Sequence, residues 1–169
     1  LDVVLRAARR LRELGRDDLV FLLVGDGAVR GELERQARAE RLSSVVFTGR
    51  QPKQRMPEFL AATDVCLVHL IRKALFETVL PSKIFEASAA GRPIVLGVEG
   101  DAAQLVSAAG AGLCIEPENE GELVEALTQL AGDRSLAHRL GANGLSRLAA
   151  RYDVDRLAES YLELLERVG

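Results

Sequence analysis

The chain reads Thr78-Val-Leu-Pro-Ser-Lys-Ile-Phe-Glu-Ala-Ser-Ala-Ala-Gly-Arg-Pro93 at its centre, and this segment predicts a short helix with well-marked ends. Ser82 is expected to be the N-cap, because its hydroxyl can accept a hydrogen bond from a free amide one turn further on. Gly91 suits the left-handed residue that ends a helix, and Pro93 prevents the helix from resuming. The small residues in between predict a helix that packs closely against a sheet.

Glu86 is the one acidic residue in this apolar or small run. Burying a lone carboxylate is costly, so Glu86 either lies on an exposed helix face or faces a ligand at the open edge of a sheet. Ser82 lies one turn earlier on the same face. The free amides and partial positive charge of the helix start suit a phosphate. The segment could therefore hold a phosphate at one end and a sugar hydroxyl near the other.

Outside this segment, short apolar runs alternate with amphipathic ones. Residues 19–24 are continuously apolar, which is typical of a strand that is buried on both faces in a parallel sheet. The expected strands are 19–24, 45–48, 64–70, 93–97 and 112–115, and the other expected helices are 1–14, 29–41, 56–62, 101–109, 119–131, 135–151 and 154–168. This alternation predicts an α/β fold with a doubly wound parallel sheet.

The first helix carries an apolar stripe from Leu1 to Leu14 and has no strand before it. Such a helix is normally the crossover that follows a first strand, which is central in the order 3-2-1-4-5-6. We therefore expect the chain to start just after this strand, and direct pairing of 19–24 with 64–70 would contradict that order. Residues 1–151 are expected to form one domain. Residues 152–169, after a break at Tyr152-Asp153, are expected to be a helix that packs toward another domain.

The composition is that of an ordinary globular protein, with 169 residues, 48% hydrophobic and 28% charged. A net charge of −3 argues against a nucleic-acid binder. Cys66 and Cys114 lie in apolar runs and are expected to be buried, reduced thiols. His69 and His138 lack metal-ligand spacing. No apolar run is long enough to span a bilayer and no signal peptide is visible, so a reducing cytoplasm is expected.

In doubly wound sheets, ligands bind beyond the carboxyl ends of the strands, where this chain has several glycines and basic residues. Glycines there permit tight turns and close approach to a ligand. The turn at 25–27 lacks the third glycine of a dinucleotide fingerprint, which disfavours a nicotinamide or flavin cofactor. No Asp-x-Asp cluster for a divalent metal is present. Four basic residues could neutralise a diphosphate, or could equally be solvated surface charges: Arg50, Arg72, Lys73 and Lys83.

The series of motifs resembles the C-terminal, nucleotide-sugar-binding domain of GT-B glycosyltransferases of the family 4, group 1 type. It consists of Phe21-Leu-Leu-Val-Gly-Asp-Gly, Val45-Val-Phe-Thr-Gly, Ala61-Ala-Thr-Asp-Val, Pro81-Ser-Lys-Ile-Phe-Glu and Gly112-Leu-Cys-Ile-Glu-Pro. The resemblance covers essentially the whole chain, in the family's order and spacing. The Pro-Ser-Lys variant is similar to the branch that transfers amino sugars in O-antigen and capsule assembly.

The resemblance implies a donor site, and it assigns these residues to it: Gly25, Gly27, Gly49, Arg50, Thr78, Pro81, Ser82, Lys83 and Glu86. Glu86 matches the second glutamate of the family's Glu-x7-Glu motif, which binds the ribose hydroxyls. The first glutamate would fall at Thr78 and is absent, while Glu77 is one residue out of register. Ser82 and Lys83 match positions that meet the diphosphate. The family's diphosphate-clamping arginine and lysine would precede Leu1, and the acceptor site and much of the catalytic machinery would belong to an N-terminal domain.

The implied function is transfer of a sugar with retention of configuration, from a UDP-sugar to a glycan or polyprenyl-linked acceptor in cell-surface polysaccharide synthesis. The sugar could be an N-acetylamino sugar, no metal or other cofactor is implied, and the full enzyme could lie at the inner face of the plasma membrane. Alone, the chain is expected to bind donor without transferring it. Two alternatives remain open, a GT-B UDP-sugar epimerase half and a non-enzymatic doubly wound binding module.

Overall fold

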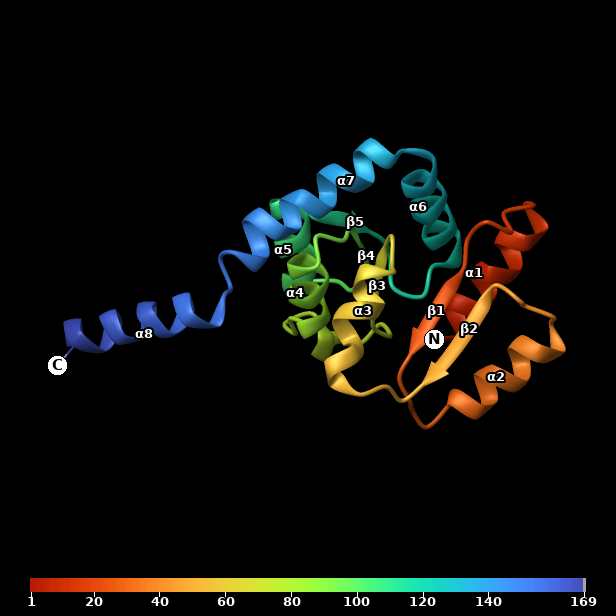
Figure 1. The fold of residues 1–169 in the computed structure, drawn as a ribbon, viewed down its shortest axis with the longest axis horizontal. Helices are drawn as coiled ribbons and strands as arrows, with labels where there is room; N and C mark the ends of the chain where they lie inside the picture. The colour runs from red at the N-terminus through yellow and green to blue at the C-terminus, as the bar shows by residue number, and fades with distance from the viewer. Residues whose placement is uncertain (169) are drawn as a thin grey trace.

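The structure, a computed structural model, describes residues 1–168 and arranges their five strands in two parallel sheets (Figure 1). In the first sheet, β1 (Phe21–Val24) pairs with β2 (Val45–Gly49). In the second, β4 (Ile94–Gly97) is central, between β3 (Cys66–His69) and β5 (Gly112–Cys114). Every pairing is parallel, and the predicted α/β fold class is confirmed.

The two sheets do not pair with each other within residues 1–168, so β1 has one strand neighbour, β2, and β3 has one, β4. The amides of Phe21 and Gly25 point to the edge of β1 that faces β2 and donate hydrogen bonds there, at 2.8 and 2.9 Å. Leu22 and Val24 therefore turn their backbone groups to the other edge of β1, because successive residues of a strand alternate in direction. The pairing of β1 with β2 and the order β3-β4-β5 are the ones that the predicted order 3-2-1-4-5-6 requires of its strands 2 to 6. The direct pairing that would contradict that order is not seen.

This arrangement corrects one expectation about β1. Residues 19–24 were expected to be buried on both faces, but Val20 is 62% exposed and Leu22 is 38% exposed. The physical reason is that a parallel strand is buried on both faces only where helices cover both, and the helices that pack on β1 contact the face of Phe21 and Leu23.

The helices follow the expected alternation and shift at their ends by one or two residues in most cases. They are α1 (Asp2–Glu13), α2 (Arg30–Ala39), α3 (Met56–Ala61), α4 (Ser82–Ala89), α5 (Asp101–Ala109), α6 (Glu120–Gly132), α7 (Arg134–Asn143) and α8 (Val154–Val168), with 3-10 turns η1 (Lys53–Arg55) and η2 (Ala74–Phe76). The expected helix 135–151 was wrong as one α-helix. It changes to a π-helix, η3 (Gly144–Ala149), where Gly144 packs against Ser88 of α4.

Two helices, α1 and α6, join the two sheets through one hydrophobic core. That core contains Val3, Leu11 and Leu123, and apolar side chains of both β1 and β3 pack against it. An ion pair of 2.6 Å between Arg6 and Glu120 links the same two helices. The expected stripe of α1 is buried in its middle, whereas Leu1 and Leu14 are 51% and 60% exposed, because they flank the helix rather than belong to it.

A second core lies between α4, α5 and the β3–β4 pair, and a third lies between α1, α2 and the β1–β2 pair. Ile84 and Ala87 of α4 are buried in the second core, as the small-residue segment predicted. Gly91 has φ +64°, so it is the left-handed residue that follows α4, as expected. The close packing leaves Glu86, on the same helix, near the surface.

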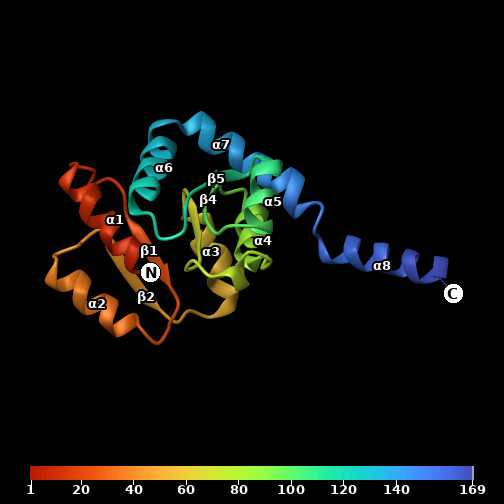
Figure 2. The ribbon, with the colours of Figure 1, turned by 180° about the vertical axis from the view of Figure 1, so that it is seen from behind.

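Helix α8 extends away from the rest of the molecule in both views (Figures 1 and 2). Before it, Tyr152 packs on Phe85 of α4 with ring centroids 5.1 Å apart. Exposed side chains on α8 include Tyr161, Leu164 and Leu165. Packing of residues 152–169 toward another domain stays a prediction, and residue 169 lies outside the described residues. Across residues 1–168, no helix is both long and apolar enough to cross a membrane.

Candidate functional site

Ser82, Lys83 and Glu86 meet on the first turns of α4. Lys83 Nζ lies 3.0 Å from both carboxylate oxygens of Glu86, and the Ser82 hydroxyl lies 3.3 Å from Glu86 Oε1. Spacings of three and four residues place these side chains on one helix face. Lys83 is 66% exposed and Glu86 is 37% exposed, so a ligand in solvent can reach both. The structure therefore brings together three of the predicted donor-binding residues.

The start of α4 differs from the expected N-cap. Pro81 is the capping residue, with an extended backbone, and Ser82 is already helical. Because Ser82 is inside the helix, its hydroxyl turns to Glu86 instead of a backbone amide. Ile84 donates to the Pro81 carbonyl at 3.0 Å. Within residues 1–168, the amides of Ser82 and Lys83 donate to no backbone carbonyl and remain available to an anion.

The predicted glycine turns of β1 and β2 also come together. The amide of Gly25 donates to the carbonyl of Gly49 at 2.9 Å. Both residues have positive φ, +132° and +69°, which favours glycine. Gly27 does not share this requirement, and a Cβ built there would meet no atom within 4 Å.

Arg30, the first residue of α2, completes this cluster, and the sequence analysis missed it. A Cβ at Gly49 would lie 2.8 Å from Arg30 Nη1, so the guanidinium covers the glycine. Arg30 is held by Glu34 at 2.7 Å and by Asp26 at 3.8 Å. The signal was a basic residue at a helix start after a glycine turn, with acids four residues to either side.

Other predicted donor-binding residues do not belong to either of these clusters. Arg50 and Thr78 are exposed, and their side chains make no hydrogen bond or ion pair within the described part of the chain. In the same range, no hydrogen bond joins the cluster of Gly25 and Gly49 to the cluster on α4. The roles of Arg50 and Thr78 in donor binding stay predictions.

Arg72 was considered as a counter-charge for a diphosphate, but the structure gives it other partners. Its Nη2 lies 3.1 Å from Glu99 Oε1 and 3.2 Å from Glu116 Oε1. The hydrogen bond with Glu116, followed by the charge of Glu99, raises the pKa of Arg72. Arg72 therefore links the loops that follow β3, β4 and β5, and its charge is already balanced.

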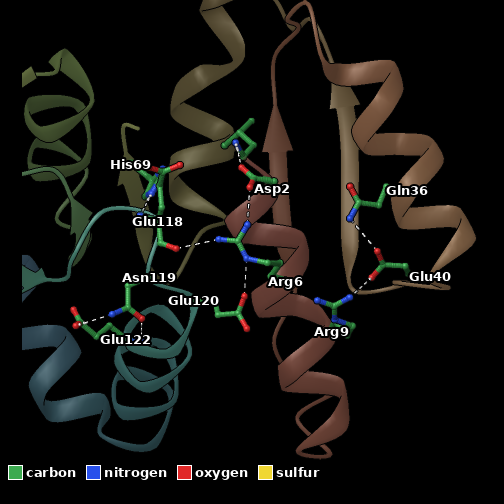
Figure 3. Close-up of polar contacts among 11 residues, drawn as sticks. Asp2, Arg6, Arg9, Gln36, Glu40, His69, Glu118, Asn119, Glu120 and Glu122 are labelled. Atoms are coloured by element: carbon green, nitrogen blue, oxygen red, sulfur yellow. Dashed lines mark hydrogen bonds and ion pairs between the residues drawn. The ribbon is translucent and has the colours of Figure 1, made fainter. Parts of the chain in front are cut away.

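A polar network that the sequence analysis did not identify joins α1 to the carboxyl end of β3 (Figure 3). The Glu118 amide donates to His69 Nε2 at 2.8 Å, and the Glu118 carbonyl accepts from Arg6 at 3.0 Å. Asp2 and Glu120 each lie 2.6 Å from Arg6. Glu118 has φ +64°, so its backbone is held in a conformation that is unusual for a side chain of this kind. These contacts fix the loop between β5 and α6.

His69 must be neutral to accept this hydrogen bond, which places its proton on Nδ1. Burial is the main cause that lowers the pKa of His69 from 6.5. Glu118 and Asp2 act in the opposite direction, and Arg6 acts in the same direction as burial. The ring also fills the space beside Gly97, where a Cβ would lie 2.6 Å from His69 Cδ2.

We expect the stability of the protein to fall as the pH drops below about 6.5. The folded state binds a proton on His69 less readily than the unfolded chain does, so the stabilisation is complete above pH 6.5 and is lost toward the lower, folded-state pKa. The loss should be below about 1 kcal/mol, because the ring is only partly buried and water screens its charge. Urea titrations at pH 7.5 and 5.5 measure it. His69→Gln should reduce this pH dependence, and a pH dependence equal to that of the wild type in this variant would contradict the assignment.

The cysteines were expected to be buried, and this is wrong for one of them. Cys66 is partly buried, and burial raises the pKa of its thiol. Cys114 is exposed, because β5 is an edge strand of three residues, and its Sγ lies 3.3 Å from Ser107 Oγ. Both thiols are free. Among residues 1–168, no group of three or more His, Cys, Asp or Glu side chains is placed to hold a metal ion.

Several known proteins are similar to this chain in sequence. O-antigen chain mannosyltransferase C of Escherichia coli is 27% identical over 170 residues, covering 97% of this chain and 42% of the relative. The putative colanic acid biosynthesis glycosyl transferase WcaI of Escherichia coli K12 is 32% identical over 132 residues, covering 76% of this chain and 31% of the relative. The chain thus spans less than half the length of these relatives.

The fold is also similar to that of a solved protein. The crystal structure of Anabaena Alr3699/HepE in complex with UDP and glucose superposes with a TM-score of 0.81 at 22% identity, covering 98% of this chain and 44% of that one. The family model for glycosyl transferases group 1 matches residues 1–147. The chain therefore belongs to the group 1 glycosyl transferases.

Proposed function

We propose that this chain forms the nucleotide-sugar donor site of a glycosyltransferase, with α4 as its centre. The observation that carries the proposal is the meeting of Ser82, Lys83 and Glu86 at a helix start whose first amides are unpaired within residues 1–168. Glu86 would accept hydrogen bonds from the ribose hydroxyls. Lys83 and the amides of Ser82 and Lys83 would face the diphosphate.

This arrangement suits the chemistry of glycosyl transfer. As the bond between sugar and diphosphate breaks, negative charge grows on the leaving group. Fixed amide dipoles and a nearby ammonium stabilise that charge without needing to reorganise. Lys83 can serve in this way because its side chain is largely exposed, with Glu86 as its one ion-pair partner within residues 1–168.

The finer assignments rest on the resemblance and on the relatives. We infer a UDP-sugar as donor, with UDP as the nucleotide bound in Alr3699/HepE, and an N-acetylamino sugar as one candidate for the transferred group. The acceptor would be a glycan or polyprenyl-linked chain in cell-surface polysaccharide synthesis, as the names of the O-antigen and colanic acid relatives suggest. Transfer with retention, a second domain that carries the acceptor site, and a place at the cytoplasmic face of the membrane belong to the same proposal.

Calorimetry with UDP, GDP, ADP and UDP-N-acetylglucosamine tests the donor site. Glu86→Ala should weaken binding of the preferred nucleotide about ten-fold or more, because hydrogen bonds to a charged group contribute roughly 1.5–3 kcal/mol. Glu58→Ala is the matched control, because Glu58 is exposed on α3 and has an arginine partner three residues away, as Glu86 has a lysine.

The possible results separate the parts of the proposal. Selective UDP binding that is lost in Glu86→Ala supports both the site and the base. Selective GDP binding with the same loss supports the site and overturns the choice of UDP. Wild-type affinity in Glu86→Ala overturns the role of Glu86.

A further inference from the structure

The loop between β3 and α4, residues 70–81, leads directly into the first turn of α4. It is attached to the turn between β4 and α5 at two points. At the first, Arg72 makes its ion pair of 3.1 Å with Glu99. The Arg72 amide also donates to Glu118 at 3.2 Å, so the start of the loop is fixed from two sides.

The second attachment is in the middle of the loop and uses backbone atoms. The carbonyl of Glu77 accepts a hydrogen bond of 2.8 Å from the amide of Asp101. Gly100 lies directly against the same carbonyl, and a Cβ built on Gly100 would overlap it. Gly100 also has φ +74°, a conformation that favours glycine. Both features let the backbone of Glu77 rest on the start of α5.

Glu77 is followed by Thr78, and three residues separate it from the capping residue Pro81. The helix beyond Pro81 is fixed by its buried residues, Ile84 among them. The segment between the Glu77 contact and α4 is thus held at both ends. The position of this segment decides which of its atoms lie beside the unpaired amides of α4 and beside the pair of Lys83 and Glu86.

We propose that the Asp101 amide and Gly100 are positioning residues for the donor site, and that they act by holding the Glu77 carbonyl. This inference rests on the proposed function, because it gives the hydrogen bond between the Asp101 amide and the Glu77 carbonyl a role in donor binding. Neither residue need touch the donor. Their effect reaches it through the segment from Glu77 to Pro81.

A matched pair of variants isolates the amide from the side chain. Asp101 is the first residue of α5, a position where proline is well tolerated because its missing N–H is not needed by the helix. Asp101→Pro therefore removes the hydrogen bond to Glu77 and keeps α5. Asp101→Ala keeps the amide and removes only the carboxylate.

We expect Asp101→Pro to weaken binding of the preferred nucleotide about ten-fold, with a melting temperature close to that of Asp101→Ala. Asp101→Ala should bind like the wild type. Hydrogen exchange should become faster in residues 74–81 of Asp101→Pro, while the interior of α4 stays protected. Unchanged exchange in that loop, or unchanged affinity despite faster exchange, would overturn the proposal.

The exchange measurement also separates this inference from the proposed function. If the wild type binds none of the four nucleotides, the proposed donor site is overturned, and the positioning role is overturned with it. Whether the hydrogen bond between Asp101 and Glu77 holds the loop is then judged from hydrogen exchange in residues 74–81 alone. If the wild type binds and both Asp101 variants lose affinity equally, the carboxylate rather than the amide is responsible, and the proposal fails.

Glu99→Gln tests the attachment at Arg72 through the sign of its effect. If Arg72 anchors the loop, losing the ion pair should weaken nucleotide binding about two- to five-fold, as for an exposed pair. If Arg72 instead serves the diphosphate, freeing it from Glu99 should tighten binding. Tighter binding, or no change, would show that the ion pair of Arg72 with Glu99 does not help to position the loop.

Discussion

Replacing Leu123 with alanine should destabilise the protein by about 2–5 kcal/mol, through the lost side chain and the cavity left behind. Leu123 is fully buried on α6, in the core that β1 and β3 share. No strand pairing joins the two sheets within residues 1–168, so this core carries much of the contact between them. We therefore expect faster hydrogen exchange in both sheets together.

Urea denaturation of Leu123→Ala measures the change in the free energy of unfolding. Leu145→Ala is the control, because Leu145 is 50% exposed and its loss should cost little. A cost below about 1 kcal/mol for Leu123→Ala would show that the site collapses around the smaller side chain. Faster exchange in one sheet only would show that the sheets are not held by a common core.

The second large effect is expected for Gly141→Ala on α7. Alanine normally stabilises a helix interior by roughly 1 kcal/mol relative to glycine. At Gly141, however, the added Cβ would overlap the carbonyl of Gly91, in the turn that ends α4. Helix α7 would have to move away from this turn, so we expect a net loss of about 1–3 kcal/mol.

Gly132→Ala is the matched control, because Gly132 is also helical and a Cβ there would meet no atom within 4 Å. It should be neutral or slightly stabilising. Thermal unfolding of the two variants, followed by circular dichroism, should give a lower melting temperature for Gly141→Ala and an unchanged or slightly higher one for Gly132→Ala. A stabilising Gly141→Ala would mean that α7 can shift at little cost, and that its contact with Gly91 does not restrict the fold.

The sequence predicted the fold class well, because the alternation of apolar runs and amphipathic helices is a local property. The bounds of α5 and α8 agree with their expected ranges, and Asn119, where the expected helix 119–131 begins, caps α6 by accepting from the Glu122 amide at 3.1 Å. The left-handed conformation of Gly91 was also predicted from the sequence, and the structure has this residue at φ +64°. Errors arose where neighbours in space decided the outcome, as for the exposure of Leu22 on β1 and of Cys114 on the edge strand β5.

The candidate site divides in the same way. The spacing of Ser82, Lys83 and Glu86 alone determined that they share a face of α4, because helical periodicity fixes which residues meet. Only the tertiary structure decided that Arg72 is taken up by Glu99 and Glu116, that Arg30 covers Gly49, and that the carbonyl of Glu77 rests on Gly100. Each of these contacts joins segments that are not neighbours in the sequence. Such contacts depend on where the strands of the two sheets end in space, and local sequence patterns carry no record of that.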